Sequence, residues 1–528
     1  MTPDLAVRPR AGTGPPAGLG RLRTTRSRPS PVLLLLAAAV VALVATPVVF
    51  IVTELLAQPD GSVWQAFWRP RTQTLTLNTI ALVVTVTTGT LLIGLPTAYL
   101  IARTDLAWRR GWQVLTALPL AVPSYVAGFA WVSLTPVRGF WGSVIVITLV
   151  SSPYVTLPVT AALLRADTDA EAVARTLGAG PLRAFWSATL PQIAPAAGAG
   201  ALLVALYTLG EFGAVAIMRF PALTWSIQTA FGGTFNRSLA LVLCLILVAL
   251  ALVVVVLERA VRRRDTGHGR VRVDEAAARA RLGPGGQLLA AGALTGLCFA
   301  AIGVPVVTMT IRAVQSVAER ELEAARLAEA AATTVLLGLG GAVLAALLAL
   351  PIGILSARHR ARTVGALETA TYLGHGLPGI VLGLSMVYLA LLLLPSLYQT
   401  LWVLVLAYGI LFVPKAAGSV RTAVGQVPLE LEDVARSLGR SPVRVWTAVT
   451  ARLAWPGIAA GALLVALTVM KELPATLLLR PTGTDTLATR LWQLTDIAAY
   501  GAAAPYAIVL VVIASVPAFL LSRRLGTS

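Results

Sequence analysis

Two carboxylates and two ammonium groups lie within apolar runs of this chain, at Glu211, Glu472, Lys415 and Lys471. A charged side chain inside an apolar segment is costly and normally faces a water-filled path or a partner of opposite charge. Glu211 and Glu472 could therefore flank a pathway for a solute. Two other roles are open: Glu211 could pair with Lys471, or the two glutamates could cap helix kinks near Gly210 and Pro474. Lys471 and Glu472 are adjacent, so each needs its own partner.

Other kinds of chemistry are excluded by composition. The chain has two lysines, Lys415 and Lys471, and neither follows a glycine-rich loop or precedes Ser or Thr, so it has no P-loop for ATP phosphates. Cys244 and Cys298 lie in apolar runs and the three histidines are scattered, which leaves neither a disulfide framework nor a histidine-based metal centre. We therefore expect no catalytic residue, no firmly assigned metal ligand and no cofactor bound by this chain.

The charged residues named first lie in long apolar runs of the chain. Hydrophobic residues make up 57% of the 528 residues and charged residues 12%, about half the charged fraction of soluble globular domains. A membrane helix needs about 20 apolar residues, and twelve runs of that order predict an all-α polytopic membrane protein with about 12 transmembrane helices. They lie near 32–54, 76–101, 113–134, 141–163, 195–218, 238–257, 287–311, 332–356, 369–394, 401–420, 456–479 and 503–522.

The loops between these runs differ in charge. With the N-terminus in the cytoplasm, the inner loops and both termini carry 30 Arg and 13 acidic residues, whereas the outer loops carry 10 Arg and 8 acidic residues. Basic residues gather on the cytoplasmic side of membrane proteins, so we expect a multi-pass protein of the cytoplasmic membrane with both termini inside. The first apolar run is longer than the apolar part of a signal peptide and is expected to be an uncleaved span.

The chain contains an internal repeat. ARTLGAGPLRAFWSATLPQIAPAAGAGALLVAL, from Ala174, matches ARSLGRSPVRVWTAVTARLAWPGIAAGALLVAL, from Ala435, at an offset of 261 residues that also pairs Glu211 with Glu472. Upstream, LPTAYLIAR and LPIGILSAR share an offset of 255. Each half then has six spans, so the halves enter the membrane in one orientation and their equivalent loops face the same side.

This repeat predicts the domain organisation. An Arg- and Pro-rich cytoplasmic tail precedes the first half, and an Arg-rich cytoplasmic linker separates the halves; we expect its arginines to serve topology and contact with membrane lipid rather than nucleic acid. The expected boundaries are 1–31 for the tail, 32–257 for the first half with its repeated loop at 165–194, 258–286 for the linker, and 287–528 for the second half with its repeated loop at 421–455.

The repeated loops have a helix–glycine–helix pattern. Residues 171–177 favour a short helix that Gly178 can end in a turn with positive φ, and Pro181 suits the first turn of a second helix. Phe185 and Trp186 then give that helix aromatic anchors. Such a projecting knob is a docking surface for another protein, although it could instead lie on the lipid headgroups.

The first loop, EAVARTLGAGPLRAFWSATLP, is similar to the EAA loop of binding-protein-dependent ABC importer permeases. The second loop, EDVARSLGRSPVRVWTAVTAR, follows the same pattern but has Ala451 and Arg452 in place of Leu-Pro. The resemblance covers the whole span architecture and implies the type I importer permease fold in two pseudo-symmetric six-helix halves. Its matching loop positions are Glu171, Ala172, Gly178, Pro181, Leu190, Pro191, Glu432, Gly439 and Pro442.

The resemblance also implies partners. The two loops would insert as coupling helices into two copies of a separate cytoplasmic ATPase subunit, and a substrate-binding protein would deliver cargo on the outer face. ATP and magnesium would bind to the partner, which agrees with the missing P-loop, so the chain itself is not expected to be an enzyme. Because both halves are fused, no second permease chain is required.

Within that family, GEFGAVAIMRFP and MKELPATLLLRPTGTDTLATRLW most resemble the ferric-iron permeases. On this interpretation Glu211 and Glu472 could contact iron in passage, since oxygen ligands suit a hard cation. Thiamine or another small solute is the alternative cargo. A different class, an ion-coupled secondary transporter, also uses parallel six-span repeats and could bind its coupling ions at the same glutamates.

Two prolines complete the candidate pathway. Pro123 and Pro378 occupy equivalent places in the third span of each half and are expected to break its helix. Unwound backbone at membrane depth must face a cavity or protein rather than lipid, so these breaks could line the path or could be kinks alone.

Overall fold

The computed structural model describes residues 29–58, 61–233, 236–264, 280–318 and 323–525. Over these ranges the chain consists of α-helices joined by turns and short 3-10 or π-helical segments. Most of the predicted tail and most of the predicted linker lie outside the described residues. The expected all-α architecture is confirmed for the part of the chain that is described.

Nine helical segments in the described ranges are long and apolar enough to cross a membrane. They arise from nine of the twelve predicted runs. They are α1 (Pro31–Leu56), α3 (Pro70–Arg103), α6 with α7 (Gly139–Ser151 and Pro153–Arg165), a π-helical turn with α10 (Phe185–Thr189 and Leu190–Gly210), α13 (Arg237–Arg264), α14 with α15 (Pro284–Cys298 and Val304–Ala318), α16 (Ala324–Arg358), α19 (Leu401–Gly425), and α21 with a π-helical turn and α22 (Pro442–Val445, Trp446–Thr450 and Ala451–Met470).

The third span of each half is broken, as the prolines predict. In the first half α4 (Arg109–Ala117) and a 3-10 turn (Leu118–Ala121) meet α5 (Ser124–Leu134) at a bend of 91°. In the second half α17 (Arg362–Leu373) and a 3-10 turn (Gly374–Gly376) precede α18 (Gly379–Leu393). Pro123 and Pro378 are the residues before α5 and α18, with φ of −61° and −63°. The twelfth run forms α25 (Tyr500–Leu525).

The fifth span of each half ends earlier than the apolar pattern indicates. The runs 195–218 and 456–479 were expected to be continuous helices, and this is wrong: α10 ends at Gly210 and α22 at Met470. Two short helices follow in each half, α11 (Gly213–Ile217) and α12 (Leu223–Gly232) in the first, α23 (Pro474–Leu479) and α24 (Leu487–Asp496) in the second. Glu211 and Glu472 therefore lie at helix breaks and not within a helix.

The two halves are interlocked. The second, fourth and fifth spans form a central bundle in each half, with α3, α7 and α10 packed together in the first and α16, α19 and α22 in the second. The first span of each half packs against the other half. α1 packs on α16 and α18 of the second half, and α15 packs on α5 of the first. Val40 and Val44 of α1 accordingly belong to the same buried cluster as Leu404 of α19. Each half completes its core with a helix from the other.

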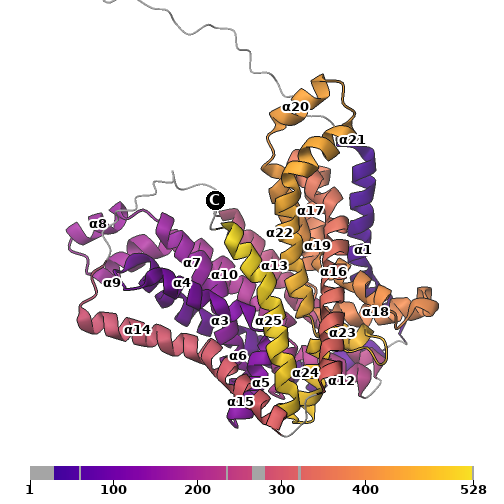
Figure 1. The fold of residues 1–528 in the computed structure, drawn as a ribbon, viewed down its shortest axis with the longest axis horizontal. Coiled ribbons are helices and arrows are strands. Elements are labelled where there is room, and N and C mark those ends of the chain that lie inside the picture. Colours follow the sequence, from indigo (N-terminus) through magenta and orange to yellow (C-terminus); the bar gives the residue numbers. More distant parts are fainter. Residues whose placement is uncertain (1–28, 59–60, 234–235, 265–279, 319–322, 526–528) are drawn as a thin grey trace, which may run out of the picture.

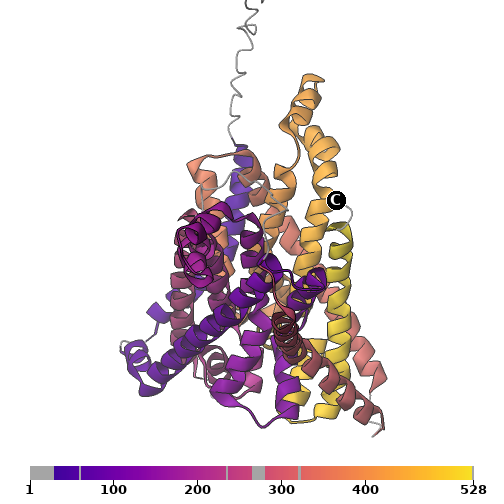
Figure 2. The same ribbon diagram turned by 90° about the vertical axis from the view of Figure 1, so that its left-hand side faces the viewer.

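The repeated loops lie at one end of the molecule. Figure 1 shows α8 (Asp169–Thr176) and α9 (Pro181–Ala184) at the left edge of the molecule and α20 (Leu429–Ser437) and α21 at its top, both away from α12 and α24 at the lower end. The start of α1 and the end of α25 lie at the upper end too, and the rotated view agrees (Figure 2). The described ends of the chain therefore share a side with both loops.

Candidate functional site

Each repeated loop forms a helix–turn–helix knob. The first knob comprises α8, Gly178 and α9 (residues 169–184), and the second comprises α20, Gly439 and α21 (residues 429–445). Gly178 and Gly439 adopt φ of +85° and +76°, the left-handed region that favours glycine. The amide of Gly178 donates to the carbonyl of Arg175 (3.0 Å), and that of Gly439 to Arg436 (2.9 Å), closing equivalent helix ends. The predicted positive-φ turn is present in both halves.

The helices after the glycines also follow the prediction. Pro181 and Pro442 are the first residues of α9 and α21. A π-helical turn then leads into the next span, over Phe185–Thr189 in one half and Trp446–Thr450 in the other. Leu190 and Pro191 open α10 just as Ala451 and Arg452 open α22. The departure from Leu-Pro in the second loop therefore leaves its secondary structure unchanged.

Glu432 holds the second knob to the rest of the molecule. Its buried carboxylate accepts hydrogen bonds from Arg358 at the end of α16 (2.5 Å), from Arg436 in α20 (3.0 Å) and from the hydroxyl of Thr450 in the π-helical turn (2.8 Å). Arg358 also donates to the carbonyl of Val427 (3.1 Å). One carboxylate thus joins the knob, the turn after it and the end of the second span.

Glu171 accepts fewer hydrogen bonds in the first knob than Glu432 accepts in the second. It accepts from Arg175 (2.6 Å) and from the hydroxyl of Thr189 (2.8 Å), and its partner Arg175 is 45% exposed. Arg103, the repeat equivalent of Arg358, donates to the carbonyl of Ala166 (3.0 Å) and makes no ion pair with Glu171 in the described contacts. The second knob is clamped to its own half more firmly than the first.

Six members of these networks were missed as site residues, although the sequence carries a signal for each. Thr189 and Thr450, like Arg175 and Arg436, fall at equivalent positions of the 261-residue repeat. Arg103 and Arg358 are the final residues of LPTAYLIAR and LPIGILSAR. A polar residue kept in register in two copies of an otherwise apolar segment indicates a shared contact.

The outer faces of the knobs carry exposed apolar side chains at equivalent positions. Val173 and Leu177 of the first knob are 57% and 82% exposed, and Val434 and Leu438 of the second are 57% and 75% exposed. Ala172 is exposed on the same short helix. Clustered apolar residues at a projecting tip are typical of a surface that another protein covers.

A second set of candidate residues meets at the breaks after the fifth spans. Glu211 is buried and accepts hydrogen bonds from the hydroxyl of Ser124 (2.8 Å) and from the amide of Ala214 in α11 (2.9 Å). Thr224 donates to the Glu211 backbone carbonyl (2.7 Å). The carboxylate thereby caps α11 and ties it to the first residue of α5.

Glu472 occupies the equivalent break. It accepts from the amide of Ala475 in α23 (3.1 Å), and Thr476 donates to its backbone carbonyl (2.7 Å). Gly379, at the repeat position of Ser124, lies against this carboxylate, because an added Cβ would collide with Oε1 of Glu472. The second half therefore keeps the cap and lacks the hydroxyl partner.

Lys471 connects the two halves through a carbonyl. Its ammonium donates to the carbonyl of Leu120 (3.1 Å), in the 3-10 turn just before Pro123. Among the described contacts it forms no ion pair with Glu211. Of the two alternative roles for the glutamates, capping is the one observed. The break before Pro123 leaves a carbonyl that Lys471 satisfies.

We expect Ser124→Ala to destabilise the protein by about 1–3 kcal/mol, because Glu211 would remain buried with fewer donors. The thermal unfolding midpoint of the detergent-solubilised protein measures this. Ser133→Ala in the same helix is the matched control, since its hydroxyl bonds only to the carbonyl of Ala130 (3.0 Å). Equal midpoints for the two variants would show that Ser124 contributes nothing to holding Glu211.

Residues 91–265 and 349–525 match the family described as binding-protein-dependent transport system inner membrane component. The chain is 35% identical over 462 residues to the Fe(3+)-transport system permease protein FbpB 2 of Haemophilus influenzae, covering 87% of this chain and 91% of that protein. It is 32% identical over 187 residues to the molybdenum transport system permease protein ModB of Mycobacterium tuberculosis, covering 32% of this chain and 71% of that protein.

A further relative is the sulfate transport system permease protein CysT of Escherichia coli, with 33% identity over 138 residues, 23% of this chain and 50% of that protein. The two segments that match the family contain one knob each. Of the three relatives, the first aligns over both halves.

Proposed function

Because this chain belongs to the family of binding-protein-dependent transport system inner membrane components, we propose that it is the membrane-spanning subunit of an ATP-driven importer of ferric iron. The observation that carries the cargo assignment is the 35% identity to a Fe(3+)-transport permease over 87% of this chain, which includes both halves. The molybdenum and sulfate relatives align over a third of the chain or less. Oxygen ligands at Glu211, which is buried, and at Glu472, which is half-buried, are compatible with a hard cation.

The two knobs support the proposed partners. Each presents exposed apolar residues at equivalent positions, Val173 and Leu177 in one and Val434 and Leu438 in the other, at the same end of the molecule. We assign this end to the cytoplasm, with one copy of an ATPase subunit on each knob. Both termini are then cytoplasmic, as the arginine-rich loops predict. ATP hydrolysis takes place on the partner, because the chain has no P-loop.

The opposite end, with α12 and α24, faces outward in this arrangement and receives a substrate-binding protein. Knobs of this kind have no purpose in a secondary transporter, which needs no ATPase. The family membership therefore favours ATP-driven import over ion-coupled transport.

The test is stimulation of ATP hydrolysis by the complex reconstituted in liposomes with its ATPase. A binding protein loaded with ferric iron should raise hydrolysis several-fold when it is added to the face opposite the knobs, and should have no effect from the other face. Binding proteins loaded with molybdate, sulfate or thiamine serve as controls. Stimulation by a thiamine-loaded or oxyanion-loaded protein, with no response to the ferric form, would refute the iron assignment.

A further inference from the structure

Tyr125 carries a buried hydroxyl that has no hydrogen-bond partner among the described residues. The residue is 4% exposed and is the second residue of α5, next to Ser124. Its ring lies against the backbone just after Glu211, where Gly213 leaves room: an added Cβ there would lie 2.6 Å from Cβ of Tyr125. A buried hydroxyl without a partner lowers stability, so packing alone does not account for it.

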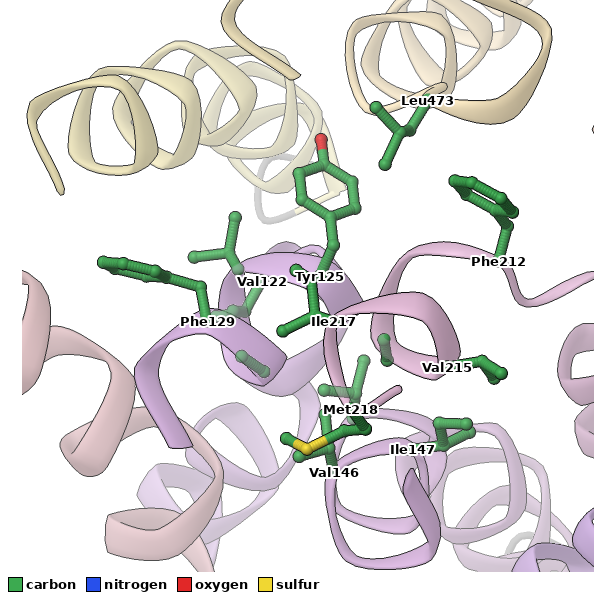
Figure 3. Packing of buried hydrophobic residues seen from close by; sticks show 14 of the residues in the cluster. Val122, Tyr125, Phe129, Val146, Ile147, Phe212, Val215, Ile217, Met218 and Leu473 are labelled. Carbon is green, nitrogen blue, oxygen red and sulfur yellow. The ribbon is translucent and has the colours of Figure 1, made fainter. Parts of the chain in front are cut away.

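The hydroxyl is directed at the other half of the molecule. Figure 3 shows Tyr125 extending from α5 toward the segment that carries Leu473, with Phe212 on the adjacent segment. Leu473 follows Glu472 and Phe212 follows Glu211, at equivalent positions of the repeat. Both carboxylates lie close enough to Tyr125 to act on it electrostatically. Three side chains that bear oxygen thus gather where the halves meet.

The repeat makes this arrangement asymmetric. The equivalents of Ser124 and Tyr125 in the second half are Gly379 and Ile380. Tyr125 therefore has no tyrosine at its repeat position in the second half. Glu211 is already bonded to Ser124 and Ala214, whereas Glu472 accepts only the amide of Ala475 in the described contacts. The unpartnered phenol and the less satisfied carboxylate come from opposite halves.

We propose that Tyr125, Glu211 and Glu472 form a transient oxygen-donor site for a hard trivalent cation at the interface between the halves. The inference rests on the proposed function and adds the residues that the cargo contacts. Two carboxylates and a phenolate are ligands that hard cations prefer. The phenol proton leaves to water on ligation, when the site is open to solvent. In the structure Tyr125 and Glu211 are buried and Glu472 is half-buried.

Lys471 fits a site that must also release its ion. It follows α22 at the same break as Glu472, and its ammonium is held by the carbonyl of Leu120. A fixed positive charge beside a cation site weakens the binding of the cation. Passage through a transporter requires binding weak enough for the ion to leave.

The test compares Tyr125→Phe with Tyr408→Phe in the complete reconstituted transporter. Tyr408 is a buried tyrosine of the second half whose hydroxyl is occupied by Thr476 (2.6 Å). Tyr125→Phe should lower iron uptake about tenfold, the effect of losing a ligand worth about 1.4 kcal/mol, without lowering the thermal midpoint. Tyr408→Phe should lower the midpoint and leave uptake near that of the wild type. A purely structural Tyr125 would give unchanged uptake.

A second measurement uses the metal alone. Fe³⁺ bound by a phenolate has a visible charge-transfer absorption, so titration of the solubilised transporter with the ferric nitrilotriacetate complex should produce this band in the wild type and Tyr408→Phe, and not in Tyr125→Phe. A band that is missing in the wild type or persists in Tyr125→Phe, or uptake that Tyr125→Phe does not reduce, would overturn the site. A wild type that shows the band but does not import iron would contradict the proposed function and leave the site standing.

Discussion

Replacing Gly178 and Gly439 together by valine should reduce ATP-driven uptake at least about tenfold while the protein still inserts into the membrane at wild-type amounts. Both glycines have positive φ, +85° and +76°, with open space around them. An L-residue forced into the left-handed region costs about 1–2 kcal/mol. Each valine therefore destabilises the native orientation of its knob. A loss of 1.4 kcal/mol in the free energy of docking lowers the docking equilibrium constant about tenfold.

Gly180→Ser is the matched control for this experiment. It lies two residues after Gly178 in the same knob, its φ is outside the positive region, and its repeat equivalent is Ser441. It should leave uptake unchanged. Membrane insertion is measured by the amount of solubilised protein, and coupling by ATP consumed per ion imported. Normal uptake by both single variants and by the double variant would show that the knob turns do not transmit the ATPase motion.

These turns were predictable because their cause is local. A positive-φ glycine after a short helix, followed three residues later by proline, specifies the same geometry wherever it occurs, and the repeat supplies it twice. The breaks at Pro123 and Pro378 were also predicted, since a proline removes a helix hydrogen bond. Proline alone does not specify a break, because Pro96 and Pro351 lie inside α3 and α16.

The ends of α10 and α22 were not predictable from local pattern. Apolar residues continue past Gly210 and Met470, so periodicity extends the helix through Glu211 and Glu472. The break is stabilised by groups distant in the chain: Ser124 lies 87 residues from Glu211, and Lys471 reaches the carbonyl of Leu120 from 351 residues away. Such partners are visible only after the halves have packed.

The difference between the contacts of the two knobs was also not predictable from the sequence. The repeat pairs Arg103 with Arg358 and predicts equal contacts for them. In the structure Arg358 reaches Glu432, whereas Arg103 donates to the carbonyl of Ala166. Equivalent residues in a fused pair can differ because each half packs against a different neighbour. Function can then be divided unequally between two loops of almost the same sequence.

This division predicts that Glu432→Ala is far more damaging than Glu171→Ala. Glu432 and Arg358 are 7% and 12% exposed, and removing one member of a buried pair costs about 3–5 kcal/mol. Glu171 pairs with the 45% exposed Arg175 four residues on, an interaction worth about 0.3–0.5 kcal/mol. We expect uptake to fall at least about tenfold for Glu432→Ala and about twofold for Glu171→Ala, with co-purification of the ATPase subunit reduced in the same order.

Two further variants test whether the effect of Glu432→Ala comes from the Glu432–Arg358 ion pair or from the loss of a negative charge alone. Glu430→Ala removes an exposed carboxylate from the same helix and should leave uptake unchanged. Glu432→Ala combined with Arg358→Leu removes both partners, and replacing a whole buried ion pair by apolar groups is close to neutral. The double variant should therefore recover much of the uptake lost in Glu432→Ala. If Glu171→Ala and Glu432→Ala reduce uptake equally, the Arg358 contact is not what holds the second knob in its docking position. If the double variant does not recover, the loss in Glu432→Ala does not come from the unpaired charge left on Arg358.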